Sequence, residues 1–287
     1  MKPILHVRNL TKRYGKGCPE CFESTGPLRE TNQCPRCLSI LACRGVSFNL
    51  FPGEVLGIVG ESGSGKSTVV RLLHFDFEPT EGEFRLSLNG NGNPDRAPGI
   101  DPAQNLFTLS AFRRRQVRND LMGIVYQNAR MGLRMKVSAG GNIAERLLMA
   151  GGRHVGRMRQ RAADLLTQTE VPVRRMNELP RNFSGGMQQR VQIAKALSTH
   201  PAVLLLDEVT TGLDVSVQAR VLDLIRGLQQ GLGVATIVVS HDLGVIRLLT
   251  SRTIVMRHGL IVEEGLSDQI LEDPQHPYTQ LLVNSTL

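Results

Sequence analysis

The sequence predicts an α/β fold with a mainly parallel sheet, and three observations lead to this prediction. Short stretches of apolar and β-branched residues, typical of buried strands, occur at 55–59, 203–206 and 235–239. Segments of helical period alternate with these strands. The first of the strands also runs directly into a glycine-rich loop and a helix, at 60–73. With 287 residues, of which 41% are hydrophobic, the chain can bury a core of this kind.

The first half of the chain alternates between regular and irregular stretches. Residues 4–10 alternate apolar and polar side chains, which predicts a half-buried strand. Residues 15–45 are rich in Gly, Pro and Cys and show neither a helical nor a strand period, so we expect them to form a separate insert. Residues 90–108, with repeated Gly, Pro, Asn and Asp, are predicted as loop. Further strands are expected at 46–51, 55–59, 83–88 and 122–126.

The second half is mainly helical between its strands. Residues 128–182 have a helical pattern, clearest at 144–149 and 158–166, which interrupts the alternation of strands and helices. We therefore expect an inserted helical subdomain there. Other helices are predicted at 184–198, 215–228, 267–271 and 278–283, with one more after the cap at 240–242. The remaining strands are expected at 203–206, at 235–239 and in a hairpin of 254–256 with 260–262.

The loop at 60–67 fits the phosphate-binding pattern G-x-x-x-x-G-K-[ST] at every fixed position. Glycines let backbone N–H groups turn toward phosphate oxygens, and the N-terminus of the following helix adds partial positive charge. Lys66 would reach the β- and γ-phosphates of ATP, and the Ser67 hydroxyl would ligate Mg²⁺. The residues expected to contact the nucleotide here are Gly60, Glu61, Ser62, Gly63, Ser64, Gly65, Lys66, Ser67 and Thr68.

Two carboxylates directly follow the apolar strand 203–206. Asp207 fits the acid that holds Mg²⁺ in phosphate-loop nucleotidases, and Glu208 stands where a base could polarise the attacking water. A second glycine-rich helix start, at 184–186, would make another anion-binding nest. One nucleotide does not need two such loops from one chain. The sequence therefore predicts a dimer in which each chain offers its second loop to the other chain's ATP.

Four of the five cysteines form two C-x₂-C pairs, Cys18 with Cys21 and Cys34 with Cys37. Such pairs make a tetrahedral thiolate cage for zinc, which would be structural because four thiolates leave no open position for chemistry. An iron–sulfur cluster, disulfides and unliganded thiols are the alternatives. Cys43 is expected to be a buried small hydrophobe. Because the insert follows Tyr14, we expect it near the adenine side of the nucleotide site.

The bulk composition restricts the partners and the compartment. The net charge is +8, with basic clusters at 113–118, 153–161 and 174–175, but no aromatic residues interleave with them. A solvated face or a dock for an acidic protein is therefore favoured over a nucleic-acid surface. The chain shows no apolar run of membrane-spanning length and no signal-peptide pattern, so a cytoplasmic protein is expected.

Taken in order, these motifs resemble those of the ABC ATPase family over nearly the whole chain. The resemblance implies one nucleotide-binding domain over 1–287, with a helical subdomain at 128–182 and a zinc-ribbon-like insert at 15–45. The matching residues are the aromatic Tyr14, the phosphate loop at 60–67, Gln127, the signature Ser184, Gly185, Gly186, Met187 and Gln188, the acids Asp207 and Glu208, Asp214 of the D-loop, and His241.

The resemblance also implies a role for each motif. Tyr14 would stack on adenine, Gln127 would sense the γ-phosphate and Mg²⁺, Ser184 and Gly186 would close over the partner subunit's γ-phosphate, Glu208 would be the general base, and His241 would contact the γ-phosphate. Two residues depart from the family pattern. The signature has Met-Gln after its glycines, as is frequent in peptide importers, and Val209 stands where Pro is usual, which questions the rigidity of that turn.

Within the family, 53–67, 213–220 and 276–282 resemble the oligopeptide and dipeptide permease ATPases. Segments 137–147 and 241–249 are also similar to the ATP-binding subunits of bacterial carbon–phosphorus lyase systems. This similarity implies a homodimer on a soluble phosphonate-degrading complex. An importer ATPase on membrane permease subunits is the second hypothesis. A DNA-repair ATPase is third, because repair members usually carry two ATPase units or long insertions.

Overall fold

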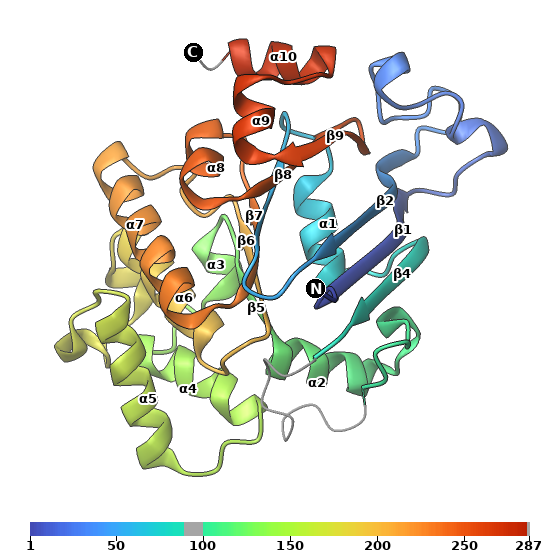
Figure 1. The fold of residues 1–287 in the computed structure, drawn as a ribbon. Coiled ribbons are helices and arrows are strands. Elements are labelled where there is room, and N and C mark those ends of the chain that lie inside the picture. The colour runs from blue at the N-terminus through green and yellow to red at the C-terminus, as the bar shows by residue number, and fades with distance from the viewer. Residues whose placement is uncertain (89–99, 286–287) are drawn as a thin grey trace. The chain divides into compact units, whose positions relative to one another are not determined.

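The structure is a computed structural model that describes residues 1–88 and 100–285 (Figure 1). The chain divides into two compact units. The first contains the described parts of 1–89, 100–110 and 235–287, and the second contains Ala111–Val234. Each unit is described separately below. Within the described residues, no helix is long and apolar enough to cross a membrane.

The first unit contains a three-stranded antiparallel sheet of order β2-β1-β4. Leu5 of β1 pairs with Leu50 on one side and Leu86 on the other, and all three side chains are buried. The alternation in 4–10 thus predicted a strand correctly, although the strand runs further. The strands are β1 (Leu5–Tyr14), β2 (Ile40–Leu50) and β4 (Glu81–Leu86).

Strand β2 begins at Ile40, whereas the sequence pattern predicted its start at Val46. The prediction was wrong because Ala42, Cys43 and Gly45 resemble the irregular composition of the preceding insert. Backbone pairing of β2 with β1 nevertheless extends as far as Tyr14 opposite Ile40. The predicted irregular stretch at 15–45 is therefore irregular only up to the start of β2. It contains two short 3₁₀ helices, Pro19–Cys21 and Pro27–Arg29.

The first unit also contains four strands in the order β7-β3-β8-β9, with β3 parallel to β7 and β8 and with β9 antiparallel to β8. All five residues of β7 are buried, which suits a parallel strand covered on both faces. The strands are β3 (Val55–Val59), β7 (Ala235–Val239), β8 (Arg252–Arg257) and β9 (Leu260–Leu266). The helices are α1 (Lys66–Leu73), α8 (Leu243–Leu249), α9 (Ser267–Glu272) and α10 (Pro277–Asn284). All of these elements were predicted, with boundaries that differ by a few residues.

The second unit packs helices around two parallel strands, β5 and β6, whose residues are all buried. The strands are β5 (Met122–Val125) and β6 (Val203–Asp207). The helices are α2 (Ala111–Leu121), α3 (Ala129–Gly132), α4 (Ala139–Met149), α5 (Val155–Gln168), α6 (Gly185–Leu197) and α7 (Val215–Leu232). The predicted helical patterns lie within α4 to α7.

Two parts of the chain differ from, or lie outside, the sequence prediction. Helix α2 was not predicted, because four of its residues are arginines and only its buried Val117 and Leu121 mark an inner face. The predicted loop at 90–108 lies partly outside the described residues, and its described part contains a short 3₁₀ helix at Leu106–Thr108.

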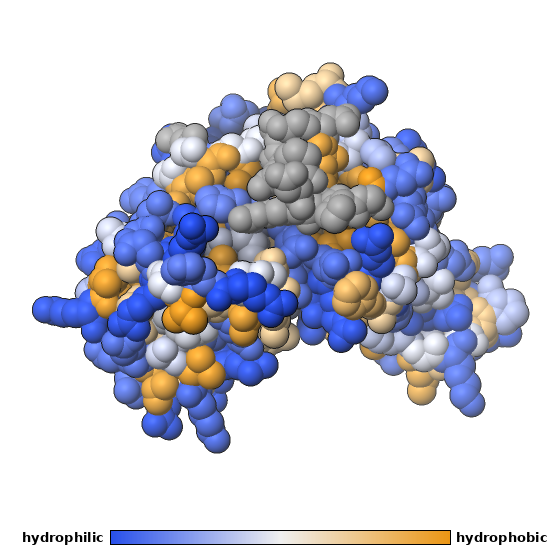
Figure 2. Space-filling view, turned by 90° about the horizontal axis from the view of Figure 1, so that it is seen from below, coloured by the Kyte–Doolittle hydropathy of each residue, from blue (hydrophilic) through white to orange (hydrophobic). Residues whose placement is uncertain are grey.

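Figure 2 views the structure from the side of α2, α4 and α5, where hydrophobic residues form small groups among hydrophilic ones.

The start of α4 depends on one buried amide side chain, that of Asn142, which is fully buried. Its Oδ1 accepts a hydrogen bond from Arg134 N at 2.8 Å, and its Nδ2 donates to the carbonyl oxygens of Arg134, Val137 and Ser138 at 2.9–3.1 Å. One side chain therefore satisfies several backbone groups in the turn between α3 and α4.

We expect Asn142→Ala to destabilise the protein by about 2–3 kcal/mol, because buried backbone groups would lose their partner. Urea denaturation followed by circular dichroism measures this change. Arg134→Ala is the matched control, because it keeps the backbone groups that Asn142 binds and removes an ion pair with Glu145, at 2.9 Å, whose arginine side chain is exposed. Such a pair is worth about 0–1 kcal/mol. Equal losses from the two variants would contradict the structural role of the Asn142 amide.

Candidate functional site

The phosphate loop lies between β3 and α1 in the first unit, as the motif requires. Gly65 caps α1 with φ +104°, and a Cβ atom there would lie 2.0 Å from the carbonyl oxygen of Ala42 in β2. Only glycine fits this position, because both the left-handed backbone and the adjacent strand exclude a side chain. Ser64 O accepts a hydrogen bond from Gly259 N at 3.0 Å, so the β8–β9 hairpin also holds the loop.

The lysine of the motif folds back over the loop. Lys66 is buried, and its Nζ donates to Gly60 O at 2.7 Å and to Glu61 O at 2.9 Å. Ser67 and Thr68 follow in the first turn of α1, and Ser62 and Gly63 lie at the exposed outer side of the loop. The ammonium group therefore stands at the centre of the loop, as a ligand of bound phosphate should.

Two further predicted residues belong to the same unit. Tyr14 ends β1, its side chain is 39% exposed, and its ring meets that of Phe77 edge-on with centroids 6.2 Å apart. The ammonium of Lys12 lies 5.2 Å from the centroid of the same ring. His241 follows β7 and is exposed, while Asp242 caps α8 through a 2.8 Å bond from Gly244 N to its carboxylate.

The second unit holds the remaining predicted residues. Because β5 and β6 are parallel neighbours, their carboxyl ends bring Gln127 and Glu208 together, with 3.1 Å between Gln127 Nε2 and Glu208 Oε2. The hydroxyl of Thr211 lies 3.3 Å from the same carboxylate oxygen. Asp207, the last residue of β6, is buried. Glu208 is thus a positioned carboxylate that can accept a proton from water.

The turn after Glu208 is formed with Val209 in place of the usual proline. Glu208 takes a left-handed backbone conformation, with φ +48°, and Thr211 N donates to its carbonyl oxygen at 3.2 Å. The Val209 side chain is buried. The turn is therefore fixed by packing and by a backbone hydrogen bond.

Further along, Asp214 caps α7, and the hydrogen bond from Val217 N lowers the pKa of its carboxyl group.

The signature segment forms the start of α6, as predicted. Ser184 is the N-cap, and Gly185 and Gly186 form the first turn. A Cβ atom at Gly186 would lie 2.3 Å from Val217 of α7, so the two helix starts can approach only because position 186 is glycine. Gln188 donates to Pro180 O and Phe183 O, each at 3.0 Å, which fixes the chain leading into the helix.

Two glutamines that the sequence analysis did not single out connect this helix to the loop of Gln127. Gln189 donates to Gln127 O at 2.9 Å, and Gln192 exchanges hydrogen bonds with the backbone of Tyr126 at 2.6 and 3.0 Å. Both side chains are buried. Their spacing of three, on a helix whose other inner residues are apolar, is the signal that could have identified them. They link the signature helix to Gln127.

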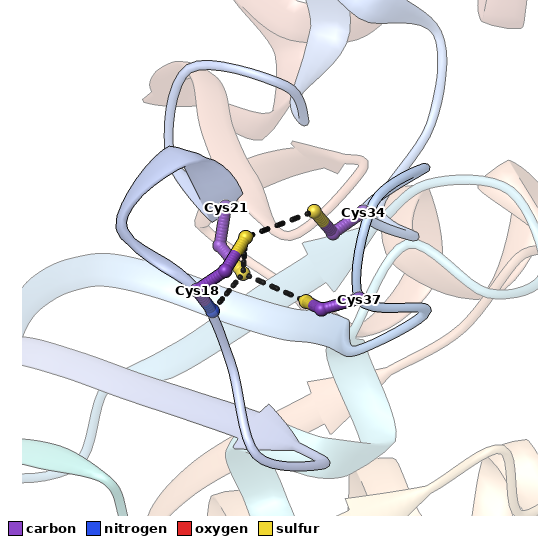
Figure 3. A group of neighbouring side chains, drawn as sticks. All are labelled: Cys18, Cys21, Cys34 and Cys37. Atoms are coloured by element: carbon purple, nitrogen blue, oxygen red, sulfur yellow. Dashed lines mark hydrogen bonds between the residues drawn. The ribbon is translucent and has the colours of Figure 1, made fainter.

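The predicted cysteine cluster is assembled in the first unit (Figure 3). Its four side chains point toward one another from two loops, and the sulfur atoms all lie within 4.8 Å of one another. Neighbouring sulfurs are 3.4–3.6 Å apart in the pairs Cys18–Cys21, Cys18–Cys34 and Cys21–Cys37. Four thiolates placed tetrahedrally at 2.3 Å from one ion would be about 3.8 Å apart. The cluster therefore fits a metal ion.

The thiols of the cluster differ in acidity from one another. Hydrogen bonding from Ser39 lowers the pKa of Cys37 to about 6, whereas burial raises the pKa of Cys18 to about 12. A cation would stabilise all four thiolates together. Cys43 is fully buried away from the cluster, and burial raises its pKa to about 12. It is an unreactive small hydrophobe, as predicted.

The sequence model of the ABC transporter family matches residues 43–211. The chain belongs to this family, whose nucleotide-binding cassettes bind and hydrolyse ATP. Its fold is similar to a dimeric ATP-binding cassette solved in a post-hydrolysis state with ADP and Pi. That likeness has a TM-score of 0.73 at 28% identity and covers 92% of this chain and 98% of the other.

Among curated proteins, the chain is 46% identical to the putative phosphonates utilization ATP-binding protein PhnK of Escherichia coli (strain K12). The alignment spans 288 residues, 100% of this chain and 98% of that protein. It is also 38% identical over 248 residues to the oligopeptide transport ATP-binding protein OppD of Bacillus subtilis (strain 168), covering 86% of this chain and 66% of that protein. The resemblances stated from the motifs are confirmed.

We expect Glu208→Gln to bind ATP but to lower kcat about a hundredfold or more, because an amide cannot accept the proton of the attacking water. The amide oxygen would keep the contact with Gln127 Nε2. Steady-state phosphate release and equilibrium ATP binding measure the two effects. Asp223→Asn, an exposed carboxylate-to-amide change on α7, is the matched control. Turnover within a few-fold of the parent would remove Glu208 from the mechanism.

Proposed function

We propose that this chain is the ATP-hydrolysing subunit of a phosphonate-degrading carbon–phosphorus lyase machine. The observation that carries the proposal is the 46% identity to PhnK, which extends over 98% of that protein. The peptide-transport relatives match at lower identity, and several of them over a smaller part of their length. ATP and reduced thiols both belong to the cytoplasm, and we place the protein there.

In the proposed catalytic cycle, the site residues described in each unit take the following roles. The loop at 60–67 and Thr68 bind the phosphates while Tyr14 stacks on adenine. Ser67 and Asp207 would hold Mg²⁺, and Gln127 would sense the metal and the γ-phosphate. The carboxylate of Glu208, oriented by Gln127 and Thr211, takes the proton from the attacking water. His241 would contact the γ-phosphate.

The active form is a head-to-tail dimer. The amino end of α6 is exposed at Ser184 and Gly185, and its backbone N–H groups and helix dipole suit an anion. In the dimer this segment, with Gln188 and with Asp214 of the D-loop, would contact the ATP of the partner. We propose further that 1–287 is one ATPase domain, in which 128–182 is the helical subdomain and the part of 15–45 that precedes β2, residues 15–39, is the cysteine insert.

The four-cysteine cluster is a structural zinc site. Two short knuckles supply the ligands, and two of the four sulfurs, those of Cys21 and Cys34, belong to buried residues. Sulfur separations of 3.4–3.6 Å are too long for a disulfide bond, which measures about 2.05 Å, and suit a tetrahedral thiolate cage. The metal would stabilise the insert, whose own hydrophobic core is small.

We expect about one zinc ion per chain in protein purified without added metal, because the four thiolates form a closed site. Elemental analysis and the absorption spectrum decide between zinc and iron. Cys34→Ser should lose the ion, whereas Cys43→Ser, outside the cluster, should retain it. Iron with visible absorption, or a metal-free chain, would reject zinc at this site.

The partner surface includes residues 130–145, which directly follow Gln127, and the basic residues of α2. Arg130 is exposed, and Met131 and Phe112 are 52% and 61% exposed, so cationic and apolar groups are both available there. Gln127 contacts Glu208, and hydrolysis at Glu208 would therefore be transmitted to this stretch. An acidic face of a soluble lyase complex is the expected partner. Membrane permease subunits are the second candidate, supported by the similarity to OppD.

We expect the tagged protein to recover lyase core proteins, identified by mass spectrometry, from phosphonate-grown source cells, with recovery that depends on ATP. Arg130→Glu should lower recovery several-fold, because it reverses a charge at the contact. Arg157→Glu, an exposed arginine on α5, is the charge-matched control. Recovery of integral permease subunits without lyase proteins would replace the first function by the second.

A further inference from the structure

Two side chains far from the phosphate-loop motif bind the backbone of that loop. Asn32, in the cysteine insert, donates from Nδ2 to Gly63 O at 3.2 Å. Tyr278, in α10, accepts a hydrogen bond on its hydroxyl oxygen from Glu61 N at 3.0 Å. The two side chains therefore bind the loop at Glu61 and Gly63, which are two residues apart. Neither contact follows from the family motifs, since the partners lie 31 and 217 residues away in the sequence.

Asn32 is itself fixed by the insert and by β2. Its carbonyl oxygen accepts a hydrogen bond from Leu41 N at 2.8 Å. Leu41 is buried against Cys21 and Cys34, two of the four clustered cysteines. The adjacent residue Ala42 is the one whose carbonyl oxygen abuts Gly65. The cysteine cluster, Asn32 and the phosphate loop therefore form one continuous chain of contacts.

Tyr278 is fixed from the opposite end of the chain. It is buried, and the guanidinium of Arg257 lies 4.8 Å from its ring centroid. The segment leading into α10 is bound to β9, because the carboxylate of Glu263 accepts hydrogen bonds from Gln275 N at 2.7 Å and His276 N at 3.1 Å. The hydroxyl of Tyr278 is thus presented to the loop by a rigid setting.

We propose that Asn32 and Tyr278 are positioning residues for ATP binding, which hold the phosphate loop in the conformation that receives the nucleotide. A loop with glycines at 60, 63 and 65 has many conformations to lose when ATP binds. Hydrogen bonds that order it beforehand reduce this entropy loss and strengthen binding. Because bound ATP also orders the loop, the two residues should affect affinity more than turnover at saturating ATP.

The first test replaces the amide donor. Asn32→Leu keeps nearly the same shape but cannot donate to Gly63 O, and we expect it to raise the Kd and KM for ATP about two- to tenfold, the value of one hydrogen bond. The kcat should stay within about twofold, because such a change removes binding common to ground and transition states. Gln33→Leu, at the neighbouring exposed position, is the control. A lower Tm with unchanged Kd and KM would show a merely structural role and overturn the proposal for Asn32.

The second test removes the hydroxyl group at the other contact. Tyr278→Phe keeps the ring under Arg257 but leaves Glu61 N without its acceptor, and we expect a similar rise in Kd. Unchanged Kd in Tyr278→Phe would overturn the role of Tyr278 independently of Asn32.

The third test asks whether the cysteine cluster acts through Asn32, and it rests on the proposed metal site. Chelation of the metal, or Cys34→Ser, should weaken ATP binding of the parent to about the level of Asn32→Leu, and should weaken Asn32→Leu little further. If loss of the metal weakened ATP binding equally in the parent and in Asn32→Leu, the proposed coupling through Asn32 would be overturned. A chain that contains no metal would reject the zinc site, while the Asn32 and Tyr278 substitutions would still test positioning.

Discussion

The close approach of β2 to the phosphate loop is the constraint on which much of the first unit depends. A carbonyl oxygen of Ala42 occupies the space that any side chain at Gly65 would need. With β2 in place, the loop can adopt this conformation only if residue 65 is glycine, and β2 begins immediately after the cysteine insert. The contact between Ala42 and Gly65 thus joins the phosphate loop to the strand that follows the insert, although these segments are separate in the sequence.

In the second unit, glutamine side chains perform the corresponding task. Gln188 holds the segment before α6, and Gln189 and Gln192 hold the backbone on either side of the Tyr126–Gln127 bond. A buried amide can donate and accept at once, so one helix face satisfies several loop groups that would otherwise be unpaired. The signature segment and Gln127 are consequently parts of one hydrogen-bonded network, which can couple the amino end of α6 to the carboxylate of Glu208.

Local patterns predicted most strands and helices, and they predicted the motif residues, because period, glycine spacing and helix caps are properties of neighbouring residues. The same reasoning failed where composition and structure disagree: β2 starts inside a Cys- and Gly-rich stretch, and α2 consists mainly of polar residues. It could not find Asn32, whose partner is 31 residues away, or Tyr278, whose partner is 217 residues away. That the insert lies near the adenine side stays a prediction. The contact of its Asn32 with Gly63 of the phosphate loop could not be predicted, because it depends on how β2 packs.

The insert begins and ends at paired residues, since Tyr14 lies opposite Ile40 across β1 and β2. It is in effect an enlarged hairpin connection, whose length adds little to the entropy of closing the turn. A family of enzymes could acquire or lose such a segment without changing the register of either strand. The same geometry makes the segment a site for insertion or replacement: a short turn, or another small domain, could stand there with the pairing of β1 and β2 intact, although the contact of Asn32 with the phosphate loop would be lost.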